Sequence, residues 1–92
     1  MQTSGKHLGK FTKADKEEAQ HYTAYTFMFV ERHTQDKYFF KYVVPRGKEP
    51  HHLVKDLNLL VRQKQQVEVE MREEQGMLKI VSMELSDRHE VQ

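Results

Sequence analysis

The 92-residue sequence has no cysteine, only two prolines and only four glycines. Without cysteine the chain forms neither disulfides nor thiolate metal sites, and nothing in its composition indicates an oxidising compartment. No apolar run approaches the roughly 18 residues that a membrane span requires, and the N-terminus lacks the charged-then-apolar pattern of a signal peptide. These absences predict a cytoplasmic protein that has no contact with a membrane.

The sequence also lacks the motifs of catalysis and of cofactor binding. It contains no glycine-rich phosphate loop and no Gly-x-Ser-x-Gly motif, and its carboxylates follow no pattern that would force a pair of them into an apolar pocket. Six histidines are present, but the adjacent His51 and His52 would point in different directions at a helix start, and no third ligand has a suitable spacing. We therefore expect no enzymatic activity, no metal site and no cofactor.

Length and composition predict one small domain. A chain of 92 residues buries roughly 60 to 65% of the surface that its unfolded form exposes, which is enough for one modest core. Hydrophobic residues make up 37% of the chain and charged residues 32%, and the hydrophobic ones are clustered and periodic. The sequence predicts a flexible tail over residues 1–11, a single α+β domain over residues 12–85 and a polar tail over residues 86–92.

The net charge of +1 hides an asymmetry along the chain. Residues 1–50 contain nine Lys or Arg and six Asp or Glu, a net charge of +3, whereas residues 51–92 contain six and eight, a net charge of −2. An asymmetry of this kind can steer a polyanion toward one side of a protein or orient self-association.

Aromatic residues are concentrated between Tyr22 and Val44, a segment that holds eight of the nine. We call this segment the aromatic hairpin, because its aromatic and β-branched content predicts two antiparallel strands over residues 22–32 and 37–44, joined by a turn at residues 34–36. Side chains alternate between the two faces of a strand, and here both faces of both strands carry apolar residues. In the first strand Tyr25, Phe27 and Phe29 share a face, and in the second strand Phe39 and Lys41 share a face.

Two helices are predicted on either side of the aromatic hairpin. Residues 12–20 begin with Thr12, a suitable N-cap, and have good helix propensity but almost no apolar stripe, which predicts a short exposed helix. Pro50 suits the first position of a second helix, over residues 51–64. Its apolar residues recur with a period of 3.6 and would cover one face of the hairpin: Leu53, Val54, Leu57, Leu60 and Val61.

The C-terminal half predicts a second hairpin. Apolar and charged residues alternate over residues 66–73, and a β-branched run follows over residues 77–85, with a turn at Gln75 and Gly76. The alternative is one long coiled-coil helix, because apolar residues from Leu53 to Leu85 also fit a heptad spacing. A glycine costs about 1 kcal/mol in a helix interior, so Gly76 favours the hairpin.

Together these elements predict the α+β class. The expected fold is an antiparallel sheet made of two β-hairpins with one amphipathic helix packed across it, in the order weak α-β-β-α-β-β. A β-grasp-like arrangement is a variant of this prediction, since a hairpin followed by a helix also opens that fold. The coiled-coil helix is the alternative for the C-terminal half.

The excess of apolar strand faces is the strongest functional signal. One amphipathic helix cannot cover both faces of the aromatic hairpin, so a second copy of the chain or another protein is expected to cover the remaining face. The sequence therefore predicts a small non-catalytic protein-interaction module, a homodimer that uses the aromatic hairpin and the basic loop after it. The expected interface residues are Tyr25, Phe27, Phe29, Phe39, Lys41, Arg46 and Lys48.

The alternative function is binding of single-stranded RNA or DNA by the same residues. Aromatic side chains on a sheet stack on bases, and interleaved Lys and Arg side chains follow the phosphate backbone. Phe39 and Lys41 have this arrangement, and Arg46 and Lys48 lie at the end of the same hairpin. The consensus of the RNA-recognition motif is absent, so the prediction rests on residue types alone.

Overall fold

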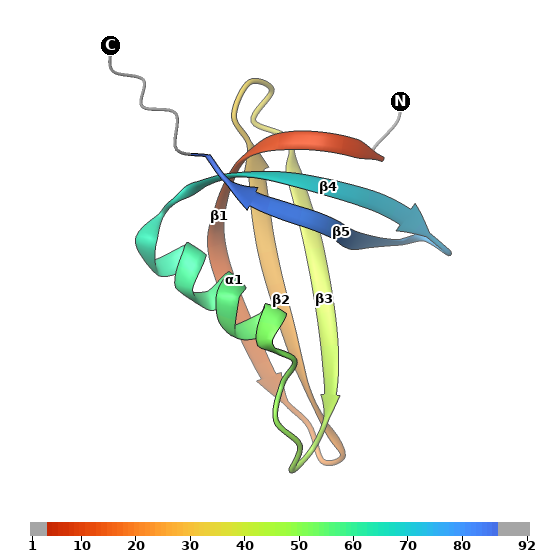
Figure 1. Cartoon of the computed structure of the whole chain (residues 1–92). Coiled ribbons are helices and arrows are strands. Elements are labelled where there is room, and N and C mark those ends of the chain that lie inside the picture. The colour runs from red at the N-terminus through yellow and green to blue at the C-terminus, as the bar shows by residue number, and fades with distance from the viewer. Residues whose placement is uncertain (1–3, 87–92) are drawn as a thin grey trace.

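The computed structural model describes residues 4–86 and contains five strands and one helix (Figure 1). The order is β-β-β-α-β-β. The elements are β1 (Gly5–Glu18), β2 (Tyr22–Glu31), β3 (Lys37–Pro45), α1 (His52–Gln63), β4 (Gln66–Glu74) and β5 (Met77–Leu85). No helix within residues 4–86 has the length and apolarity needed to span a membrane.

The strands form one antiparallel sheet in the order β3-β2-β1-β4-β5, and β1 is shared between its two halves. The first part of β1, Gly5–Lys10, pairs with β4, and the longer part, Gly9–Glu18, pairs with β2. Figure 1 shows β1 bending between these two parts. The outermost strands β3 and β5 contact each other, so the sheet curls around a single core.

Two local features allow β1 to bend. Gly9 pairs with Glu31 on one side and with Val67 on the other, and its backbone lies so close to β2 that an added Cβ would clash with the Val30 carbonyl oxygen. Between Phe11 and Lys13 the register shifts by one residue, which is a β-bulge and increases the local bend and twist of a strand. The glycine and the bulge together turn one long strand into a member of two ladders.

The core lies inside the curled sheet and is closed by α1. Buried residues of α1 contribute Val54, Leu57 and Leu60 to it, as the helical periodicity predicts. The sheet contributes four fully buried phenylalanines, with the Phe11 and Phe29 ring centroids 5.1 Å apart in an edge-to-face arrangement. The other buried core residues of the sheet are Phe27, Phe40, Val67, Val69 and Met71.

The structure contradicts the predicted fold class at its N-terminal end. Thr12–Glu18 belong to strand β1 and not to a helix, so the chain has the order β-β-β-α-β-β. Three consecutive antiparallel strands precede the helix, and not the single hairpin of a β-grasp. Gly5–Phe11, predicted as flexible tail, form the first part of the same strand, and Phe11 is fully buried. Pairing with β2 along this segment outweighs the good helix propensity of its Ala, Lys and Glu residues. The remaining tail residues, 1–3 and 87–92, lie outside the described residues.

The coiled-coil alternative is also wrong, because residues 66–85 form two paired strands. Gln75 and Gly76 make the two-residue turn, and both have positive φ, 55° and 78°, as a type I′ hairpin turn requires. The second hairpin, the first hairpin and the amphipathic helix are all confirmed within a few residues of their predicted bounds. The helix begins after His51, whose Nδ1 accepts a hydrogen bond from the Leu53 amide at 3.1 Å.

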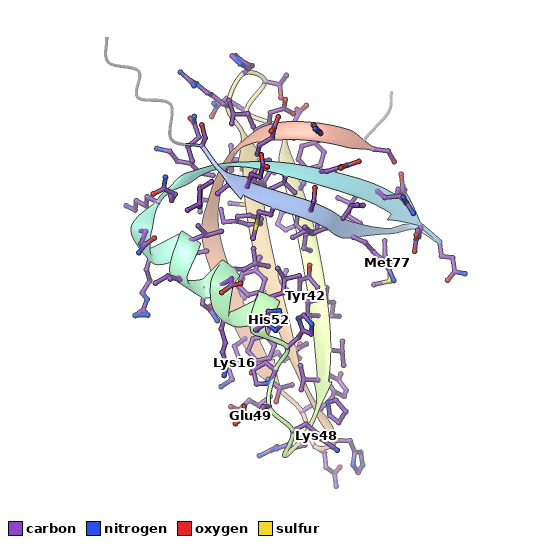
Figure 2. The ribbon with its side chains drawn as sticks, viewed as in Figure 1. Lys16, Tyr42, Lys48, Glu49, His52 and Met77 are labelled. Atoms are coloured by element: carbon purple, nitrogen blue, oxygen red, sulfur yellow. The ribbon has the colours of Figure 1, made fainter. Side chains whose placement is uncertain are left out.

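Tyr42 is the one polar side chain for which the core provides no partner. Its ring packs against the core beside Phe27, and within residues 4–86 its buried hydroxyl has no hydrogen-bond partner (Figure 2). Burial disfavours the tyrosinate and raises the pKa of Tyr42 to about 12. The folded state therefore favours the neutral phenol, and the stability associated with it is present below pH 10 and is lost as the pH rises from 10 through about 12.

We expect Tyr42→Phe to stabilise the protein. Removing a buried hydroxyl that lacks a partner should raise the free energy of unfolding by about 1 kcal/mol at neutral pH. Urea denaturation followed by circular dichroism measures this difference, and the gain of the variant over the original protein should widen between pH 10 and 12. Tyr22→Phe is the matched control, because Tyr22 is exposed. A variant less stable than the original protein would contradict the prediction.

Candidate functional site

The candidate site is the outer face of β1, β2 and β3, the face directed away from the core. In Figure 1, α1 and the β4–β5 hairpin lie in front of these three strands, so the outer face is turned away from the viewer. Strand alternation and the antiparallel registers define which side chains it carries. They are Lys10, Lys13, Asp15 and Glu17 from β1, Tyr22, Ala24, Thr26, Met28 and Val30 from β2, and Lys37, Phe39, Lys41 and Val43 from β3.

An exposed aromatic ring lies among lysines on this face. Phe39 is 56% exposed and pairs with Met28, which in turn pairs with Lys13 on β1. Lys37 and Lys41 lie two residues to either side of Phe39 on the same face of β3. We call Lys10, Lys13, Lys37 and Lys41 the lysine patch. At its centre is a shallow hollow of about 280 Å³, lined by Lys13, Asp15, Thr26, Met28, Lys37 and Phe39.

The lysine patch carries four positive charges, beside the carboxylate of Asp15 that lines the same hollow. Within residues 4–86 none of its four lysines forms an ion pair. Elsewhere Lys16, Lys55 and Lys79 each lie within 4 Å of a glutamate oxygen, at 3.2, 3.7 and 3.7 Å. The ammonium groups of the patch are therefore available to an anionic ligand.

Carboxylates give the outer face a lateral asymmetry. Asp15 and Glu17 lie on β1, whereas the corresponding positions of β3 carry Lys41 and the apolar Val43. The electrostatic potential of the outer face is therefore most positive along β3 and around the lysine patch. It is more negative along β1 from Asp15 to Glu17. An extended polyanion would be attracted to the β3 side of the face.

The structure separates the predicted site residues into two groups. Phe39 and Lys41 lie together on the outer face, as strand alternation predicts. Phe27 and Phe29 are fully buried in the core, and Tyr25 packs against it on the inner side of β2. All three side chains lie on the inner face of β2, where Phe27 and Phe29 are fully buried and Tyr25 is partly exposed.

In the basic loop after β3, Arg46 holds the loop in place and Lys48 carries an exposed charge. The Arg46 guanidinium donates a hydrogen bond to the Ala19 carbonyl oxygen at 2.8 Å, and its backbone amide donates to the His21 carbonyl oxygen at 3.0 Å. Arg46 thus ties the loop after β3 to the loop between β1 and β2. Lys48 lies exposed at the tip of the loop after β3 (Figure 2). Along β3, Arg46 is ~23 Å from Phe39, so the loop is not part of the lysine patch.

Sequence reasoning missed Lys10, Lys13 and Met28 as members of the site, whereas Lys37 was recognised as a basic residue at the end of the aromatic hairpin. Lys10 and Lys13 fell in a segment predicted as a tail and a helix, and the bulge between Phe11 and Lys13 hides their shared face from a simple alternation rule. Met28 pairs with Phe39 and so lies on the outer face, opposite the buried Phe27. The signal that could have found the patch was the alternation of Lys37, Phe39 and Lys41, once Phe40 was assigned to the core.

The remaining polar clusters offer no site for a metal. His51 and His52 stack with ring centroids 4.2 Å apart, and His51 caps α1. Within residues 4–86, no group of three or more His, Asp or Glu side chains is close enough to hold a metal ion.

The sequence matches no protein-family model, and neither a curated protein nor a solved structure shows significant similarity to it.

Proposed function

We propose that the protein binds single-stranded nucleic acid on the outer face of β1, β2 and β3. The observation that supports this most directly is an exposed aromatic ring, Phe39, surrounded by four lysines that have no ion-pair partner within the described residues. A base can stack on Phe39 and Met28 while its neighbouring phosphates contact Lys37, Lys41 or Lys13. Stacking and phosphate contacts together are the mode by which sheet surfaces bind single strands.

A single strand fits this face better than a duplex. Phe39 projects from the middle of a sheet face, so it can only stack on a base that is already unpaired and turned outward. The face presents no helix or hairpin that could enter the groove of a duplex. The hollow beside Phe39 is shallow, and it suits the flat surface of one base better than a deeply enclosed metabolite.

The topology supports the same proposal. A curled five-stranded antiparallel sheet with a shared first strand and a helix between its third and fourth strands has the organisation of the oligonucleotide/oligosaccharide-binding fold. In that fold, the face of the second and third strands is the usual ligand-binding surface. This support is an analogy at the level of topology, and the residues of the face carry the argument about chemistry.

Self-association through the aromatic hairpin stays a prediction with less support than the sequence indicated. The inner face of the hairpin is covered by α1, β1 and β4 of the same chain, so it needs no second copy to cover it. On the outer face the exposed apolar residues Phe39 and Val43 alternate with lysines, which a symmetric apolar interface would have to desolvate.

Phe39→Ala tests the proposed function. Loss of one stacked base should weaken binding by about 1 to 3 kcal/mol, which is about 5- to 150-fold in Kd. Fluorescence anisotropy with labelled single-stranded DNA and RNA measures the affinity, and the double variant Phe39→Ala, Lys41→Ala should lose more. Leu59→Ala is the matched control, because Leu59 is an exposed apolar residue on α1.

The same titrations include a second criterion. Affinity for the single strand should fall as salt rises, because each lysine that contacts a phosphate releases a counterion. Equal affinities for the original protein and Phe39→Ala, or an affinity that does not change between 50 and 200 mM salt, would contradict the proposed function.

A further inference from the structure

The outer face carries a second exposed aromatic ring, outside the lysine patch. Tyr22 is 41% exposed and is the first residue of β2, where it pairs with Pro45 at the end of β3. Between Tyr22 and Phe39 the surface is formed by Val43, 57% exposed, with Lys41 and the partly buried Thr26, whereas Ala24 is only 3% exposed. The two rings thus lie at opposite ends of one continuous strip of the sheet.

The registers fix the length of this strip. Phe39 pairs with Met28, and Pro45 pairs with Tyr22, so the two rings are six residues apart along β3. At about 3.3 Å for each residue this separation is ~20 Å. It corresponds to about six stacked nucleotides at about 3.4 Å each, and to fewer in an extended strand. A mononucleotide or dinucleotide is too short to contact both rings.

The charges along the strip indicate where the phosphates would run. Lys37 and Lys41 follow the β3 side, and the carboxylates of Asp15 and Glu17 follow the β1 side. A backbone on the β3 side approaches Lys37 and Lys41 and avoids the carboxylates, and it leaves its bases over β2, where the partly buried Met28 and Thr26 offer an uncharged surface.

The far end of the strip also carries positive charge. Lys48 is exposed at the tip of the loop that follows β3 (Figure 2), and its amide donates to the Pro45 carbonyl oxygen at 3.1 Å, which forms a tight turn. Arg46 fixes this loop to the loop that precedes Tyr22 through its contacts with Ala19 and His21. Lys48 therefore lies near the Tyr22 end of the sheet, beyond the last residue of β3.

From these observations we propose that Tyr22 forms a second stacking subsite. The ligand is then a single-stranded oligonucleotide of at least about four nucleotides, whose backbone follows β3 from Lys37 past Lys41 toward Lys48. This inference rests on the proposed function and adds the length and path of the ligand to it. Phe39 and the lysine patch bind one end of the strand, and Tyr22 with the basic loop binds the other.

A comparison of two ligand lengths tests the inference. NMR titrations of the original protein, Phe39→Ala, Tyr22→Ala and Tyr22→Phe would use single-stranded thymidine oligonucleotides of three and eight nucleotides. We expect Tyr22→Ala to weaken binding of the octamer at least fivefold and to leave binding of the trimer unchanged, because the trimer occupies only the Phe39 end. Phe39→Ala should weaken both, and Tyr22→Phe should bind both normally, since it retains the ring.

The outcomes separate this inference from the proposed function. Equal octamer affinities for the original protein and Tyr22→Ala, or an equal loss for both lengths, would overturn the second subsite while the proposed function stands. An octamer that binds no more tightly than the trimer would do the same. Failure of both oligonucleotides to bind the original protein at low salt would overturn the proposed function and the inference together.

Discussion

Gly9→Ala is expected to destabilise the protein by more than about 3 kcal/mol, a large part of the ~5 to 14 kcal/mol that a domain of this size has in total. An added Cβ would clash with the Val30 carbonyl oxygen and lie 2.9 Å from the Phe29 Cζ and 3.0 Å from the Glu31 Cα. Two of these atoms belong to the β2 backbone, which pairs with β1, so no side-chain rotation relieves the contact. Relief would require β1 and β2 to separate.

The position of Gly9 makes such a separation costly. Gly9 lies where β1 is paired with β2 and β4 at once, so moving the strand disturbs both ladders. Phe29 is in the core beside Phe11, and a shift there would also open the packing between these rings. Urea denaturation followed by circular dichroism measures the decrease in the free energy of unfolding. If the decrease exceeds the stability of the original protein, Gly9→Ala is unfolded even without urea.

Gly76→Ala is the control that distinguishes a steric clash from the loss of glycine's backbone freedom. An alanine at residue 76 would meet no neighbouring atom within 4 Å, but it would have to adopt a φ of 78°, which costs an L-residue roughly 1 to 2 kcal/mol. We expect Gly9→Ala to be clearly more destabilising than Gly76→Ala. The reverse order would show that β1 and β2 can move apart at Gly9 with little cost, against the packing described for the bend.

Neutralising the lysine patch is expected to have the largest effect on binding. The triple variant Lys13→Gln, Lys37→Gln, Lys41→Gln removes three charges that form no ion pair within the described residues. Each phosphate contact of a single strand contributes about 0.7 to the slope of log affinity against log salt, so the slope should fall in magnitude by about 2 and the affinity by about 10- to 100-fold at low salt. Anisotropy titrations at four salt concentrations give both quantities.

A matched triple variant controls for net charge. Lys16→Gln, Lys55→Gln, Lys79→Gln has the same net charge, but it replaces lysines that are paired with Glu18, Glu49 and Glu74. Exposed ion pairs of this kind contribute little to stability, so the control should fold normally. If the two triple variants lose affinity equally, binding follows overall charge and the lysine patch has no special role.

The sequence predicts the elements that have a clear apolar period, although the second hairpin also fits a heptad repeat. The 3.6-residue period of the helix and the alternation of both hairpins place α1, β2, β3, β4 and β5 correctly. The first strand could not be predicted in the same way. Its alternation is interrupted by the bulge near Thr12, its C-terminal part is rich in helix-forming residues, and its partner β4 lies far away in the chain.

The candidate site was partly predictable for the same reason. Strand alternation alone places Phe39 and Lys41 on one face, and the structure confirms this. The sequence does not determine which face of the aromatic hairpin lies inside. The face of Tyr25, Phe27 and Phe29 is apolar, and both a core and an aromatic binding surface have that character. That choice depends on where α1 and β1 pack, and so does the inclusion of Lys13 in the patch.

The sharing of β1 between two ladders also has a consequence for the order of folding. Strands β1, β2 and β3 are consecutive and pair through short loops, so the face that carries Phe39 and Tyr22 can form while the chain is still being synthesised. Its inner side stays uncovered until α1 and β4 have emerged, since Gly5 pairs with Met71. Until then the aromatic residues of the future core are exposed, and transiently exposed apolar surface of this kind favours association between incompletely folded chains.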